Sequence, residues 1–175
     1  DLFVVNAGQR GFWVASMSRE EFADISAARL EVEPDALRMS VGCADADWRG
    51  AVEAAYQALH SIEASLGENR QGDAPAWERA NRAFHDALLS RCPSRWMVRF
   101  VDVLAEQSER YRRKALIMHA VPVERLMAEH RAICEAALGG HADLAAELLR
   151  VHVAGAAAGI EAKLFGDEKN DHAQY

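Results

Sequence analysis

Apolar residues recur at helical spacing along most of the chain, beginning near residue 18. Ser18, followed three residues later by Glu21, forms the pattern of a capping box that starts a helix. The apolar residues of this first segment are Phe22, Ile25, Leu30 and Leu37. Proline lacks the backbone N–H that an α-helix uses, so Pro34 predicts a kink or a break within this helix.

Five further helical segments follow the first one. The periodicity predicts helices over residues 47–66, 73–92, 94–119, 122–139 and 142–164. The connections between them are short and contain glycine, proline or polar residues, which end helices. Asp73 is the expected N-cap of the third helix. Six or seven helices joined by such loops predict an all-α fold, an antiparallel bundle.

The segment before the first helix has a different pattern. The chain begins at Asp1 without Met, on the apolar run LFVV, and continues into GQRGFWV. This pattern is typical of the tail of a β-hairpin that began upstream of Asp1. The polar C-terminal residues 167–175 predict a flexible tail.

Composition supports the helical interpretation and excludes some functions. The chain has 175 residues, of which 34 are Ala, none is Thr and only 15 are Gly or Pro, so helix is favoured nearly everywhere. The 27 acidic residues outnumber the 20 basic ones, which argues against direct DNA binding. No apolar run is long enough to span a membrane, and no signal peptide opens the chain. The widely spaced Cys43, Cys92 and Cys134 predict buried, reduced thiols in a cytoplasmic protein.

Three histidines lie on the apolar stripes of three different predicted helices. These are His85, His130 and His152, and Asn81 precedes His85 by one helical turn on the same face. Any one of them alone is readily explained as a core histidine satisfied by a hydrogen bond. Three buried imidazoles are costly unless something organises them, and a divalent metal such as zinc, nickel, cobalt or iron is a natural organiser.

Enzymatic uses of such a site differ in what else they require. A di-iron carboxylate centre needs Glu-x-x-His motifs, and this chain has Arg82, Met127 and Leu149 where those glutamates would stand. A mononuclear metal-dependent hydrolase or lyase remains an alternative, although no candidate general base shares the inward stripes. A bundle that only dimerises is a third possibility.

Arginines supply candidate receptors for a carboxylate ligand. Arg29 lies close to the apolar stripe of the first helix, where an inward guanidinium would pair with two carboxylate oxygens. The cluster RYRRK at residues 110–114 covers more than half a helical turn, so most of it must face solvent. The spacing does not choose between Arg110 and Arg112 as an inward member, and we take Arg112 as the second candidate effector-binding residue.

Three short motifs carry a family resemblance. NRAFH at 81–85, EHRAI at 129–133 and RVHV at 150–153 resemble the FCD-type effector domain of GntR-family bacterial transcription regulators. The run AARLEVEPDALRMS resembles the opening helix of that domain, and GQRGFWVASMS resembles its junction with a winged-helix domain. The resemblance covers essentially the whole chain. Its sequence is most similar to those of the glutarate-responsive CsiR-like regulators. It implies three parts: the end of the wing and a linker over 1–17, the effector-binding and dimerisation domain over 18–166, and the tail.

The resemblance also implies a site and a role. In this family an Asp or Asn and three His hold a divalent metal, which assigns Asn81, His85, His130 and His152 as ligands, with zinc or nickel as the expected metal. A small carboxylic acid effector would complete the coordination and pair with Arg29. Many metal-binding members have Asp where this chain has Asn81, and a neutral amide is a weaker ligand. The implied protein is not an enzyme but a homodimeric switch, which reaches DNA only through an N-terminal domain absent from this chain.

Overall fold

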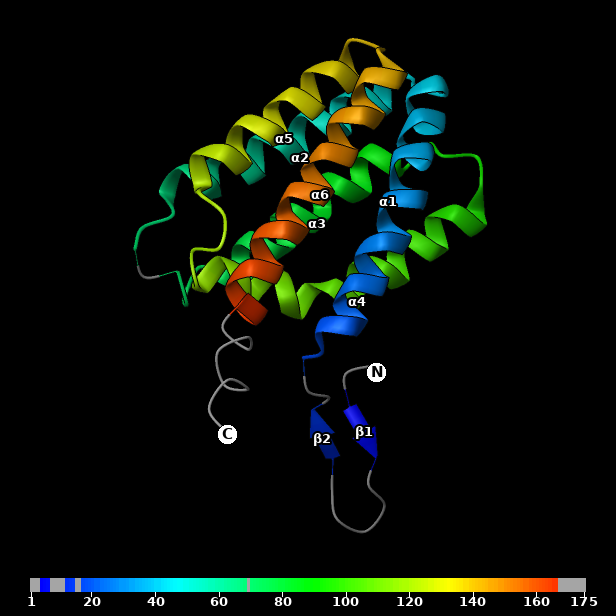
Figure 1. Cartoon of the computed structure of the whole chain (residues 1–175). Coiled ribbons are helices and arrows are strands. Elements are labelled where there is room, and N and C mark those ends of the chain that lie inside the picture. The colour runs from blue at the N-terminus through cyan, green and yellow to red at the C-terminus, as the bar shows by residue number, and fades with distance from the viewer. Residues whose placement is uncertain (1–3, 7–11, 15–16, 69, 167–175) are drawn as a thin grey trace, which may run out of the picture.

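Six helices form the body of the computed structural model, which describes residues 4–6, 12–14, 17–68 and 70–166. The helices are α1 (Arg19–Gly42), α2 (Ala46–Ser65), α3 (Ala74–Leu89), α4 (Arg95–Ile117), α5 (Val123–Leu138) and α6 (Ala142–Phe165). They pack as a bundle in which α1 contacts α3, α4 and α6, and α2 contacts α3 and α5 (Figure 1). The predicted all-α class is therefore confirmed. Among the described residues, no helix is long and apolar enough to cross a membrane.

Side-chain caps begin several helices. Ser18 Oγ accepts from the backbone N–H of Glu21 at 3.3 Å, as the capping pattern predicts. Asp45 and Ser94 cap α2 and α4 in the same way. The prediction for Asp73 is wrong in part: it stands at the N-cap position of α3 but makes no side-chain cap hydrogen bond. Its backbone is already helical, with φ −85° and ψ −22°, rather than in the extended conformation that capping residues favour.

Helix α1 runs unbroken through Pro34, so of the predicted kink or break the break is wrong. Proline leaves the carbonyl four residues earlier, that of Leu30, without its helical donor. Arg150 of α6 supplies a replacement, because its Nη1 donates to the Leu30 oxygen at 2.9 Å. A side chain 120 residues away in the sequence therefore compensates for the proline.

Two strands precede the bundle. β1 (Val4–Asn6) and β2 (Phe12–Val14) pair antiparallel, with Val5 opposite Trp13. Residues 7–11 between the strands and the predicted C-terminal tail, residues 167–175, lie outside the described residues. That the strands are the remnant of a preceding domain stays a prediction.

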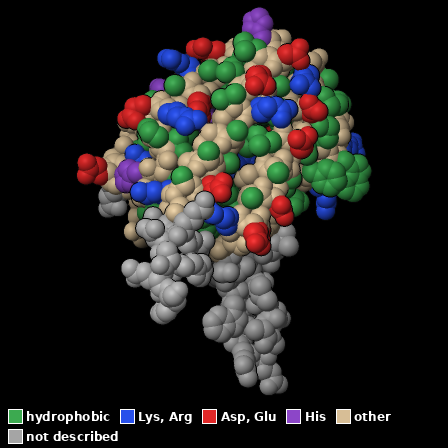
Figure 2. Space-filling model, in the orientation of Figure 1, with side chains coloured by type: hydrophobic (Ala, Val, Ile, Leu, Met, Phe, Trp, Pro, Cys, Tyr) green, Lys and Arg blue, Asp and Glu red, His purple; other side chains and the backbone are tan. Residues whose placement is uncertain are grey.

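The prediction that all three thiols are buried is correct only in part. Cys134 is buried and Cys92 half-buried, but Cys43 is exposed at the C-cap of α1, where the helix leaves the core. Acidic and basic side chains are interspersed over the face of the bundle seen in Figure 2. Basic side chains therefore do not gather into a nucleic-acid patch on that face.

Candidate metal and effector site

The three predicted histidines meet in the centre of the bundle. His85 comes from α3, His130 from α5 and His152 from α6, and one ring nitrogen of each lies within 4.8 Å of the others. The rings of His130 and His152 are 4.7 Å apart between centroids. His130 is completely buried, whereas His85 keeps some surface that faces a cavity. The helical stripes thus predicted the cluster correctly.

Two carboxylates orient two of these rings. Glu63 Oε1 lies 3.0 Å from His130 Nδ1, and Glu129 Oε2 lies 2.8 Å from His152 Nδ1. A carboxylate oxygen can only accept, so each Nδ1 carries the hydrogen and, in a neutral ring, each Nε2 presents a lone pair. This carboxylate–histidine pairing is the usual support of metal-binding imidazoles.

One buried ring nitrogen indicates that the residues present fit a divalent metal. His130 Nε2 is buried and has no hydrogen-bond partner among the described residues. Leaving a buried polar atom unpaired costs free energy, which a ligand at that atom would recover. Three imidazole nitrogens are a donor set that suits zinc or nickel.

The electrostatics keep two of the three imidazoles neutral. Burial, and then the neighbouring His152 and His130, hold the pKa of His85 well below its usual value. Burial also lowers the pKa of His152, although its hydrogen bond to Glu129 opposes that shift. Both rings are therefore neutral near pH 7, the state in which imidazole binds metals.

The supporting glutamates were missed by the sequence analysis. Glu63 is only 1% exposed and also accepts from Trp77 Nε1 at 3.2 Å. One signal was available, because Glu63 stands four residues after the buried Leu59 and so on the inner face of α2. Glu129 stands next to His130 inside a motif that the resemblance used without giving this residue a role.

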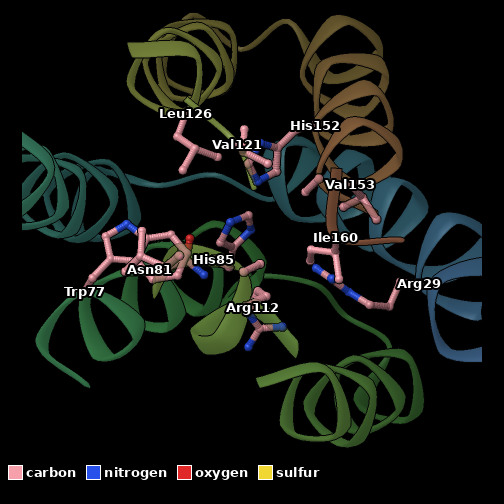
Figure 3. Close-up of a pocket in the computed structure, with 13 residues that line it drawn as sticks. Arg29, Trp77, Asn81, His85, Arg112, Val121, Leu126, His152, Val153 and Ile160 are labelled. Carbon is pink, nitrogen blue, oxygen red and sulfur yellow. The ribbon is translucent and has the colours of Figure 1, made fainter. Parts of the chain in front are cut away.

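A cavity opens beside the histidines, and Figure 3 shows its lining side chains. It contains about 530 Å³ of empty space, part of it open to solvent. Its polar residues are Arg29, Asn81, His85, Arg112 and His152. Asn81 is buried beside His85 on α3, which places it at the cluster; whether it ligates a metal stays a prediction.

Both candidate effector-binding arginines line the cavity, but each is already paired. Arg29 donates from Nε to Glu33 Oε1 at 2.5 Å and from Nη2 to Glu33 Oε2 at 3.3 Å. Arg112 pairs with the buried Glu78 of α3. Arg110, the other member left open by the spacing, instead binds Glu21 and the Tyr111 hydroxyl and is not among the lining residues.

The lining offers little for hydrolysis. Among the described residues, no Asp or Glu lines this cavity, and Glu63 and Glu129 contact His130 Nδ1 and His152 Nδ1 without being among its lining residues. A metal-dependent hydrolase needs a base within reach of a bound water.

Comparison with known proteins decides the family. Residues 24–155 match the model of the FCD domain. The chain belongs to the FCD domain family. It is 39% identical over 150 residues to an uncharacterized HTH-type transcriptional regulator, BphR, of Paraburkholderia xenovorans (strain LB400). It is 30% identical over 153 residues to the HTH-type transcriptional repressor GlaR of Escherichia coli (strain K12). These relatives are regulators, which confirms the predicted family and the prediction that this FCD chain is not an enzyme.

Solved structures share the fold. A GntR family transcriptional regulator from Pseudomonas syringae pv. tomato str. DC3000 superposes with a TM-score of 0.71 at 22% identity, over 96% of this FCD chain and 67% of that protein. A putative GntR regulator from Rhodococcus sp. RHA1 superposes with a TM-score of 0.70 at 18% identity, over 90% and 72%. The alignments with BphR and GlaR each cover 86% of this chain, but only 61% and 68% of those proteins.

Proposed function

We propose that this FCD chain is the effector-sensing and dimerisation domain of a cytoplasmic GntR-family transcription regulator. It binds a small carboxylic acid beside a divalent metal and thereby controls an N-terminal winged-helix domain. The observation that carries the proposal is the meeting of three imidazoles inside the bundle, where the buried Nε2 of His130 lacks a partner among the described residues. The metal would be held by His85, His130 and His152, with Asn81 beside them, and would offer a coordination position to the acid.

The route from site to DNA would run through α1. Arg29 of this helix lines the cavity, and α1 directly follows the segment that contains β1 and β2. A carboxylate that binds Arg29 competes with Glu33 for the same guanidinium. Because both groups lie on α1, that exchange favours one arrangement of the helix, as differential binding requires.

A stripe on α4 supports the dimer. Trp96, Phe100 and Val103 are spaced at four and three residues and are all exposed, Trp96 by 68%. Large apolar side chains in a contiguous exposed row are typical of protein interfaces. We expect Trp96→Lys to shift the protein toward monomer in light scattering after gel filtration.

Metal analysis and thermal melting test the site together. We expect purified protein to contain about one equivalent of zinc or nickel, and removal of the metal to lower the melting temperature. His130→Ala should abolish both metal content and the stabilisation by organic acids. His141→Asn is a matched control, since His141 is exposed at the start of α6 and Asn is a good N-cap. A full response to acids in a metal-free variant would refute the proposal.

A further inference from the structure

Gly155 stands in the middle of α6, where a glycine makes a helix less stable. Glycine leaves the unfolded chain more conformational freedom than alanine does, and it is a poor helix former. Gly155 follows His152 by about one turn, so both residues lie on the same side of α6. A glycine at such a place is explained when another group needs the space that a side chain would fill.

The group that needs this space is the guanidinium of Arg125, on the helix α5 that packs beside α6 (Figure 1). A Cβ atom on Gly155 would overlap Arg125 Nη2. The same guanidinium donates from Nε to Glu129 Oε1 at 2.7 Å. Glu129 Oε2 in turn lies 2.8 Å from His152 Nδ1. These contacts close a ring between the two helices: Gly155, Arg125, Glu129 and His152.

The two oxygens of Glu129 have different partners in this ring. Because one accepts from Arg125 and the other from His152, the carboxylate is held at both ends and cannot rotate away from the imidazole. The Arg125 side chain is 47% exposed, so its ion pair with Glu129 contributes little to stability. We therefore expect Arg125 to act on the orientation of the His152 ring rather than on folding.

Alanine at position 155 would displace the guanidinium and leave the helix intact. The overlapping atom is the end of a flexible side chain, which can move. The guanidinium is planar and rigid, so Nη2 cannot move without turning the Nε–H away from Glu129. Gly159, one turn later, is different, because a Cβ there would lie 3.0 Å from the backbone oxygen of Ala120.

We infer that Gly155 and Arg125 position Glu129 on His152, with the glycine leaving the room that the guanidinium needs. Both are positioning residues: neither supplies a metal ligand, and both act through the carboxylate. This inference rests on the proposed function, since its effect is on metal binding by the same histidines. It explains a glycine that helix stability alone disfavours.

Gly155→Ala separates two quantities that a purely structural residue would change together. We expect the melting temperature of the metal-free protein to rise by about 1–3 °C, because alanine is the better helix former. We expect zinc affinity, measured by competition with an indicator dye, to fall about 3–10-fold. That is less than the roughly 10–100-fold typical of a group in direct contact with a metal ligand, because Arg125 acts one step further away.

Gly50→Ala is the matched control. Gly50 is exposed inside α2, and a Cβ atom there would meet nothing within 4 Å. The substitution should stabilise the protein to a similar extent and leave zinc affinity unchanged.

Arg125→Met tests the same contact from the other helix. It should lower zinc affinity by a similar factor, and adding Gly155→Ala should then have no further effect, because no guanidinium remains to be displaced. Unchanged zinc affinity in Gly155→Ala, or an equal loss in the Arg125→Met background, overturns this inference and leaves the proposed function standing. If the unaltered protein binds no zinc, the proposed function fails, and this inference fails with it.

Discussion

Two buried polar networks flank the cavity, and they differ in how completely they are satisfied. On the α4 side, the Arg112 guanidinium donates to Glu78, to Ser108 Oγ at 2.6 Å and to the Ala105 carbonyl at 3.0 Å. On the α5 side, His130 and Trp77 both donate to a single oxygen of Glu63. There the other Glu63 oxygen and His130 Nε2 have no partner among the described residues.

This difference indicates which network stabilises the fold and which one binds a ligand. A polar network whose donors and acceptors are matched within the protein holds helices in register whether or not a ligand is bound. A network with buried unpaired atoms is costly by itself, about 1–3 kcal/mol for each such atom. The Arg112 network therefore acts first on stability, and the histidine network acts first on binding.

Removing Arg112 gives the largest expected loss of stability. Arg112→Met leaves Glu78, whose side chain is only 6% exposed, as a buried carboxylate without its partner. We expect the free energy of unfolding to fall by about 3–5 kcal/mol, measured by urea denaturation.

Two further variants check the origin of that loss. Arg113→Met should cost about 0–1 kcal/mol, because its ion pair with Glu109 is exposed. The double variant Arg112→Met with Glu78→Leu should recover most of the lost stability, since it removes both charges. A double variant as unstable as Arg112→Met would mean that the pair's charge is not the cause.

Glu63→Gln tests the other network through metal binding rather than folding. The amide still fills the same space but no longer presents a charged acceptor to His130 Nδ1, so the ring is held less firmly and is a weaker ligand. We expect zinc affinity to fall roughly 10–100-fold, measured by competition with a zinc indicator dye.

The matched control lies on the same helix. Glu53 is exposed on α2, and Glu53→Gln should leave zinc affinity unchanged. Zinc affinity unaltered in Glu63→Gln would show that this carboxylate does not orient the metal-binding ring.

The hydrogen bond from Arg150 to the Leu30 carbonyl, which compensates for Pro34 in α1, is a smaller case of a donor and an acceptor matched within the protein. Arg150→Met removes the donor to the Leu30 carbonyl and should cost about 1 kcal/mol of stability. In a Pro34→Ala background, the restored N–H of residue 34 can serve that carbonyl, so the same change should cost less than half as much. Urea unfolding of the four proteins in a double-mutant cycle measures the coupling. Equal costs in both backgrounds would contradict the compensation.

What the sequence could predict was local or periodic. The helices followed from caps and apolar spacing, and the histidine cluster followed because each His lies on an inward stripe. The partners of these residues come from other helices, and one-dimensional spacing does not contain them. Arg150 meets the turn at Pro34, and Glu63 meets His130, only after the bundle has formed. The spacing did not choose between Arg110 and Arg112 for the same reason, because their partners, Glu21 and Glu78, come from other helices, α1 and α3.

The smallest effect concerns Cys134, which shares its buried surroundings on α5 with His130. Burial, with Glu53 and Glu135 nearby, raises the pKa of this thiol to about 11, so the reactive thiolate is scarce at neutral pH. We expect iodoacetamide to label the exposed Cys43 at pH 8 while Cys134 stays unmodified, as peptide mass spectrometry would report. Because the pKa is raised, the labelling rate of Cys134 should increase up to about tenfold per pH unit between pH 8 and 10. Rapid labelling at pH 8 in folded protein would mean that this interior is not the low-polarity environment that also keeps His85 and His152 neutral.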